Sequence, residues 1–191
     1  MKTTNEMNAQ FYAHAPESMV KGLRHFRTNT AQKTLKVHKW DWHYYAVGNP
    51  DSLPLLLLHG GGGDAETMFM YIERLSRHFY VIAPNIPPKI RKLDDALAGL
   101  HTILNHEKTE QVQLVGLSFG AMLAQLYVRR FMMQVSNLVI THTVIPSDHI
   151  AERISAQLGL MRLYPAPLLK WFSRRAYNNG IENSTTPASI A

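Results

Sequence analysis

The chain has 191 residues, of which 46% are hydrophobic and 18% charged, and it carries a net charge of +6 at pH 7. This length and composition are typical of one ordinary globular domain with a sizeable core, and they exclude a disordered chain. Cysteine is absent, which excludes disulfides, a thiolate nucleophile and cysteine-based zinc sites and fits a reducing compartment.

Residues 1–33 are interpreted as an N-terminal leader with a weak helical pattern. The first sixteen residues are polar and lack the apolar core of a signal peptide, and no apolar stretch of the chain is long enough to span a bilayer. We therefore expect a cytoplasmic protein with no membrane span. The basic residues are scattered and no nucleic-acid-binding motif accompanies them, so we expect a solvated basic surface and no nucleic-acid partner.

Strand-like and helix-like patterns alternate between residues 34 and 146. Residues 36–40 and 42–47 are rich in β-branched and aromatic types around Asp41 and predict a hairpin, and residues 49–51 predict a turn. The remaining predicted elements are strands at 54–58, 79–83, 112–115 and 135–141, and helices at 65–77, 93–106 and 119–131. This alternation predicts an α/β fold with a mostly parallel sheet.

The pattern changes to helices alone after residue 147. Residues 147–180 are predicted to form a helical cap segment, and residues 181–191, rich in Ser, Thr and Pro, a disordered tail. Within the cap, residues 160–175 mix large apolar side chains with arginine and lysine. A membrane-surface helix is the alternative interpretation of that segment. We favour a cap over a pocket whose apolar lining would accept a hydrophobic acyl group.

The most informative motif is Gly116-Leu117-Ser118-Phe119-Gly120, which joins the strand at 112–115 to the following helix. A G-x-S-x-G sequence in this strand–turn–helix setting is a nucleophile elbow, in which the serine hydroxyl is exposed above the sheet. A side chain at either glycine would collide with a neighbouring strand or helix as the chain reverses. Ser118 is therefore the candidate catalytic nucleophile.

The second motif is the glycine loop, residues 59–63, His59 followed by four glycines, directly after the strand at 54–58. Its backbone amides can turn inward, so we expect the N–H of Gly61, or failing that of Gly60, to form an oxyanion hole with the N–H of Phe119. His59 is interpreted as a structural hydrogen-bonding residue and Asp64 as a helix N-cap. Neither a P-loop nor a dinucleotide-binding pattern is present, and no cofactor or metal is implied.

These two motifs resemble those of the α/β-hydrolase fold superfamily, and the resemblance covers residues 36–179. Residues 81–84, 120–125 and 160–169 also resemble the maspardin-like group. The superfamily resemblance implies a serine hydrolase acting on a small-molecule carboxylic ester or related acyl compound. The resemblance to the maspardin-like group implies an esterase-like scaffold that serves as a non-catalytic binding protein.

The superfamily resemblance also implies a triad in the order Ser, acid, His, and this order is not completed. No strand pattern follows Thr141 and no histidine follows His149. We therefore expect a C-terminally truncated hydrolase fold, either a fragment or the product of a gene that lost its last two strands. His142 and Asp148 are the local candidates for the base or acid.

Three functions remain open from the sequence: an impaired serine hydrolase, a binding protein, and an inactive remnant. If the last two strands are missing, the strand at 135–141 becomes an exposed apolar edge, which predicts either a homodimer formed through it or poor solubility.

Overall fold

The computed structural model describes residues 15–61, 63–90 and 92–142. The predicted cap at 147–180, the predicted tail, Asp148, and Gly62 of the glycine loop lie outside these residues. None of the helices within the described part is both long and apolar enough to cross a membrane.

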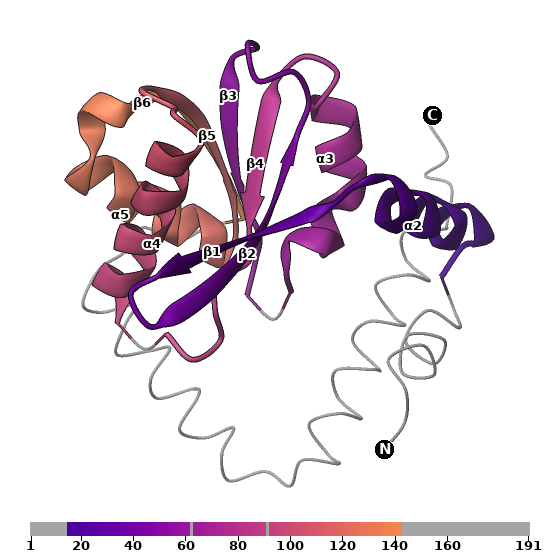
Figure 1. Cartoon of the computed structure of the whole chain (residues 1–191), viewed down its shortest axis with the longest axis horizontal. Helices are drawn as coiled ribbons and strands as arrows, with labels where there is room; N and C mark the ends of the chain where they lie inside the picture. The colour runs from indigo at the N-terminus through magenta and orange to yellow at the C-terminus, as the bar shows by residue number, and fades with distance from the viewer. Residues whose placement is uncertain (1–14, 62, 91, 143–191) are drawn as a thin grey trace, which may run out of the picture. The chain divides into compact units, whose positions relative to one another are not determined.

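A six-stranded sheet forms the centre of the described residues (Figure 1). Its strands, in chain order, are β1 (Gln32–Val37), β2 (Trp40–Val47), β3 (Pro54–Leu58), β4 (Tyr80–Pro84), β5 (Val112–Leu117) and β6 (Val135–Thr141). Their spatial order is β1-β2-β4-β3-β5-β6. The pairs β4–β3, β3–β5 and β5–β6 are parallel, and β1 and β2 extend the sheet in antiparallel fashion. The prediction of an α/β fold with a mostly parallel sheet is thus confirmed.

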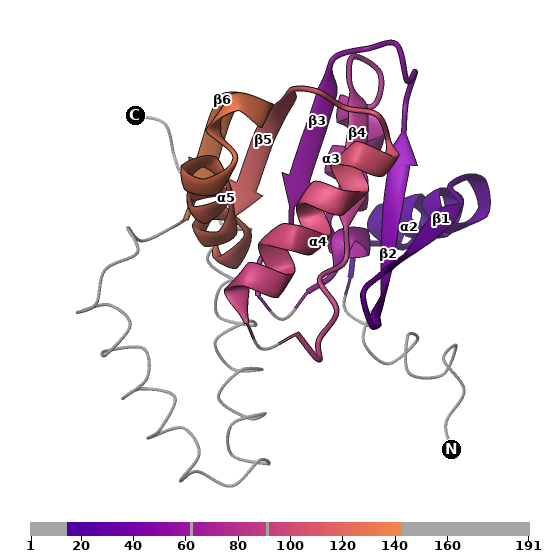
Figure 2. The same cartoon turned by 60° about the vertical axis from the view of Figure 1, so that its left-hand side comes forward.

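Helices cover both faces of this sheet (Figure 2). The α-helices are α2 (Glu17–Asn29), α3 (Phe69–Leu75), α4 (Leu93–His106) and α5 (Phe119–Arg130), and the short 3₁₀ helices are η1 (Ala65–Met68) and η2 (Met132–Gln134). Buried side chains of α4 and α5 pack on one face, and those of α2, η1 and α3 on the other. The strand β3 supplies Leu56 and Leu58 to the first cluster and Leu55 and Leu57 to the second. Burial on both faces explains why its sequence is apolar without interruption.

The predicted hairpin exists, but its turn is elsewhere. The register pairs Val37 with Trp40 and Lys36 with Asp41, so the turn consists of His38 and Lys39, and Asp41 lies inside β2. His38 has a φ of 53°, a conformation that ordinary residues adopt rarely and that matches the tight turns of two-residue hairpins. The prediction that the hairpin turns at Asp41 was wrong because the turn contains none of the usual glycine or asparagine.

Other predicted boundaries differ by small amounts. The helix expected over residues 65–77 starts as η1, continues as α3 and ends at Leu75, and the helix expected to end at residue 131 ends at Arg130. The strand expected at 79–83 is displaced by one residue, and β5 extends two residues beyond its predicted end. β3, α4 and β6 have the predicted bounds.

The strand β6 forms one edge of the described sheet and pairs with β5 alone. Leu138, Val139 and Ile140 are 39%, 53% and 37% exposed. Because successive side chains of a strand point to opposite faces, apolar surface is exposed on both faces of this edge. The segment Val135–Thr141 also has no charged residue or proline, the types that usually protect an edge strand from pairing.

Candidate active site

Ser118 alone connects the end of β5 to the start of α5. Its φ of 52° and ψ of −113° lie in a region that non-glycine residues enter at a cost of about 1–3 kcal/mol. Three backbone hydrogen bonds hold it there: its N–H donates to the Thr141 carbonyl at 3.0 Å, and its carbonyl accepts from Ala121 at 3.0 Å and Met122 at 3.1 Å. Ser118 is exposed, and its hydroxyl makes no hydrogen bond to any described residue.

The two glycines of the elbow are required by close backbone contacts. A Cβ atom on Gly116 would lie 2.6 Å from the Gly120 carbonyl oxygen, and one on Gly120 would lie 2.4 Å from the Leu58 carbonyl oxygen. Both distances are well inside van der Waals contact. The elbow therefore packs directly against the end of β3, where the glycine loop begins.

The glycine loop lies against the elbow. A Cβ atom on Gly60 would be 3.5 Å from the Ser118 Cβ, and one on Gly61 would be 3.5 Å from the Phe119 Cβ. Phe119 is the first residue of α5, where backbone N–H groups lack intrahelical partners and the helix dipole is positive. The structure thus brings Ser118, Phe119, Gly60 and Gly61 together at the carboxyl ends of β3 and β5.

Side chains at both ends of the glycine loop make local hydrogen bonds. His59 is 6% exposed, and its Nδ1 lies 2.8 Å from the Gly60 carbonyl oxygen, so Nδ1 carries a proton and donates it. This is the predicted structural role. Asp64 is the predicted N-cap, because its Oδ1 accepts from the Thr67 N–H at 3.1 Å.

Of the two candidates for the base or acid, the structure describes His142 alone. His142 follows β6 and is exposed, with Nδ1 3.2 Å from the Thr141 hydroxyl oxygen. No hydrogen bond between described residues joins His142 to Ser118; the two are linked only through Thr141, whose carbonyl accepts from the Ser118 N–H. Asp148 lies outside the described residues.

Sequence reasoning missed Asn85, which follows β4 directly. Its Oδ1 accepts from the Ala65 N–H at 2.6 Å, just beyond the end of the glycine loop. A polar residue at the carboxyl end of a buried parallel strand was the available signal, since such ends gather at one edge of the sheet.

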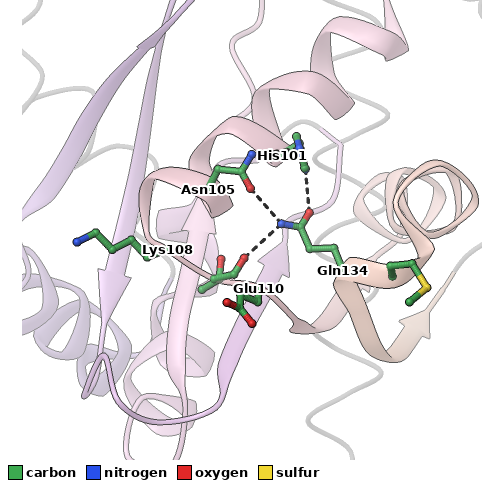
Figure 3. A pocket seen from close by; sticks show the side chains of 7 residues that line it. His101, Asn105, Lys108, Glu110 and Gln134 are labelled. Atoms are coloured by element: carbon green, nitrogen blue, oxygen red, sulfur yellow. Dashed lines mark hydrogen bonds between the residues drawn. The ribbon is translucent and has the colours of Figure 1, made fainter.

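A hollow of about 540 Å³ is lined by seven residues that do not include Ser118, and Figure 3 shows their side chains. It lies where β5 and β6 begin, whereas Ser118 follows the end of β5. Three of its polar side chains bond to one another: Gln134 Oε1 lies 2.9 Å from His101 Nδ1, and Gln134 Nε2 donates to the Asn105 amide oxygen as well as to the Thr109 carbonyl. We interpret these contacts as structural. Among the described residues, no group of three side chains is arranged to hold a metal ion.

The comparisons with known proteins agree with this geometry. Residues 55–188, more than half of the chain, match the model of the alpha/beta hydrolase family. No curated protein matches the chain.

Solved structures match the fold at low sequence identity. A candidate lipase from Acinetobacter baumannii has 20% identity and a TM-score of 0.59, with 67% of this chain and 46% of that chain covered. A serine hydrolase from Cycloclasticus zankles has 18% identity and a TM-score of 0.56, and the match covers 61% of this chain and 46% of that chain. The 2-hydroxy-6-oxo-6-phenylhexa-2,4-dienoate hydrolase from Rhodococcus sp. strain RHA1 has 20% identity and a TM-score of 0.57, with 63% of this chain and 49% of that chain covered. The chain thus spans about half the length of these structures.

Proposed function

The chain belongs to the alpha/beta hydrolase family, and on this premise we propose that it is a serine hydrolase acting on a small-molecule carboxylic ester or a related acyl bond. The single observation that carries the proposal is the conformation of Ser118, a serine held at positive φ between a strand and a helix and exposed beside a glycine loop. Strain of this kind concentrates at functional sites.

In the proposed reaction, Ser118 Oγ forms a bond to the acyl carbon, and the N–H groups of Phe119 and Gly61, or Gly60 in place of Gly61, stabilise the developing oxyanion. The bond from the acyl carbon to the leaving oxygen breaks, and a base passes the serine proton to the leaving alcohol. Water then releases the acid by the same route. His142 and Asp148 are the candidate base and acid within this chain.

Replacement of Ser118 by alanine is expected to abolish covalent labelling by a fluorophosphonate probe. The probe reacts with an activated serine, so we expect the labelling rate to fall at least about 100-fold, since acyl transfer at this site depends on the nucleophile. Intact-protein mass spectrometry measures the adduct. Ser52→Ala, which removes a hydroxyl far along the chain from the elbow, is the control and should label as the unmodified chain does. Labelling that persists in Ser118→Ala would contradict the proposal.

A non-catalytic binding protein, as the maspardin-like resemblance implies, is the second candidate. The observation that favours it is the Ser118 hydroxyl itself, which lacks a base among the described residues. An unpaired serine is weakly nucleophilic, although an oxyanion hole and binding alone still give about 10³–10⁴ over water. A cooperatively folded chain that is not labelled would favour this candidate or an inactive remnant over the hydrolase. Truncation and cytoplasmic location stay predictions from the sequence.

We also propose that β6 pairs with β6 of a second copy. Val139→Lys places a charge on this exposed apolar edge, so we expect it to raise the dimer dissociation constant at least about tenfold. Analytical ultracentrifugation measures the constant. Leu53→Lys, at a leucine outside β6 that is 63% exposed, is the control and should leave dimerisation unchanged. An unmodified chain that stays monomeric at high concentration would contradict the proposal.

A further inference from the structure

Asn85 connects the sheet to the end of the glycine loop. Its backbone N–H donates to the His43 carbonyl of β2 at 2.8 Å, and its Oδ1 accepts from the Ala65 N–H at 2.6 Å. Ala65 is 1% exposed and begins η1, so its N–H is one of the helix-end donors that has no partner within the helix. Asn85 supplies that partner from a residue that is itself tied to the sheet.

The glycine loop needs such an anchor because its own residues provide little restraint. Glycine backbones lack the steric limits that other residues impose, so the direction of the loop amides depends on what holds the two ends. At the first end, β3 and the contact of His59 with the Gly60 carbonyl hold the chain. At the second end, the contact of Asn85 with Ala65 is the bond that reaches the sheet.

A second contact at this end comes from α2. The Arg27 guanidinium of α2 donates to both carboxylate oxygens of Glu66, at 2.8 and 2.5 Å. The Arg27 and Glu66 side chains are 35% and 20% exposed, and this two-bond contact joins η1 to α2 rather than to the sheet. Asn85 therefore provides the contact that ties the backbone of the second end to the sheet.

We propose that Asn85 is a positioning residue: through the Ala65 N–H it holds the glycine loop so that the loop amides face the acyl oxygen above Ser118. The role of Asn85 in the reaction rests on the proposed function of Ser118. Its contact with the glycine loop does not depend on that function, so the two roles are measured separately. Aspartate at position 85 keeps the acceptor oxygen, whereas alanine removes it and serine is too short to reach.

Hydrogen–deuterium exchange of the unlabelled chain tests the hold on the loop. In Asn85→Ala we expect the amides of residues 60–66 to exchange about tenfold faster, because their opening loses one buried hydrogen bond. Asn85→Asp should restore the original rate. Asn49→Ala is the matched control, since Asn49 Oδ1 also accepts from a backbone N–H, that of Asp51 at 3.1 Å, in an unrelated turn. If Asn85→Ala does not fold, Asn85→Ser takes its place.

Fluorophosphonate labelling tests the effect on the reaction. We expect the rate to fall about tenfold in Asn85→Ala and to recover in Asn85→Asp, since misplacing an oxyanion donor weakens the stabilisation it gives. If the loop amides of Asn85→Ala exchange at the original rate, Asn85 does not hold the glycine loop and the proposal is overturned. Faster exchange with unchanged labelling overturns its role in the reaction. If the unmodified chain is not labelled, the proposed function fails, and the exchange result still decides whether Asn85 holds the loop.

Discussion

Gly120→Ala is expected to lower the free energy of unfolding by about 3 kcal/mol, even though alanine is the better helix former by about 1 kcal/mol. The added Cβ would lie 2.4 Å from the Leu58 carbonyl oxygen and 2.6 Å from that of His59. Both are backbone atoms at the buried end of β3, so neither can move without displacing the strand or the glycine loop. Overpacking against backbone therefore outweighs the gain in propensity.

Urea denaturation measures this effect, and Gly22→Ala is its matched control. Gly22 also lies in a helix, α2, but its added Cβ would meet only the end of the Phe69 ring, at 3.2 Å. A ring end can shift by a few tenths of an ångström, so Gly22→Ala should be neutral or slightly stabilising. A Gly120→Ala variant as stable as the unmodified chain would show that α5 does not pack against β3 as closely as described.

Gly120 also illustrates what could be predicted from the sequence. The motif predicted a turn with no room for side chains, and the predicted strands β3 and β6 and helix α4 have the observed bounds. These elements are dictated by local signals: an apolar run of strand length, a regular helical spacing and a glycine pattern between them. The hairpin turn at His38 was missed because only the pairing of whole strands forces that residue to a φ of 53°.

The candidate site was predictable in part for the same reason. The two glycine motifs predicted that residues 60 and 61 would meet Ser118 and Phe119, because the carboxyl ends of neighbouring parallel strands share one edge of the sheet. The contact of Asn85 with Ala65 joins residues twenty positions apart, and the position of Asn85 after a buried strand does not by itself identify its partner. The general base stays a prediction, since His142 makes no bond to Ser118.

The second large effect on stability is expected at Glu107, whose side chain joins distant segments of the chain. The carboxylate of Glu107, at the end of α4, is only 7% exposed. It accepts hydrogen bonds from the Tyr44 hydroxyl at 2.6 Å, from the Tyr80 hydroxyl, and from Lys33 Nζ at 2.9 and 3.0 Å. Three strands of the sheet are thus tied to α4 through one buried charge.

The protonation of Glu107 is shifted by these contacts. Burial alone would raise the pKa of the carboxyl, but the hydrogen bonds from Tyr44, Tyr80 and Lys33 and the charge of Lys33 outweigh it and lower the pKa below its usual range. For the two tyrosines, burial first and then the bond to Glu107 raise the pKa. The folded state therefore favours an ionised carboxylate beside neutral phenols.

Glu107→Gln is expected to reduce the free energy of unfolding by about 3 kcal/mol at pH 7, because hydrogen bonds to a charged acceptor are worth about 1.5–3 kcal/mol each and the amide replaces them with weaker ones. Glu110→Gln, at an exposed carboxylate between α4 and β5, is the control and should change stability by less than about 0.5 kcal/mol.

The stability lost in Glu107→Gln is also expected to depend on pH. A folded-state pKa below the unfolded value of about 4.3 contributes stability that is complete above that value and is lost as the pH falls through the folded pKa. The stability difference between the unmodified chain and Glu107→Gln should therefore be constant above about pH 5 and shrink below it. Urea denaturation between pH 3 and 7 measures the difference, and a gap that persists unchanged to the lowest pH would mean that the bonds to Glu107 do not depend on its charge.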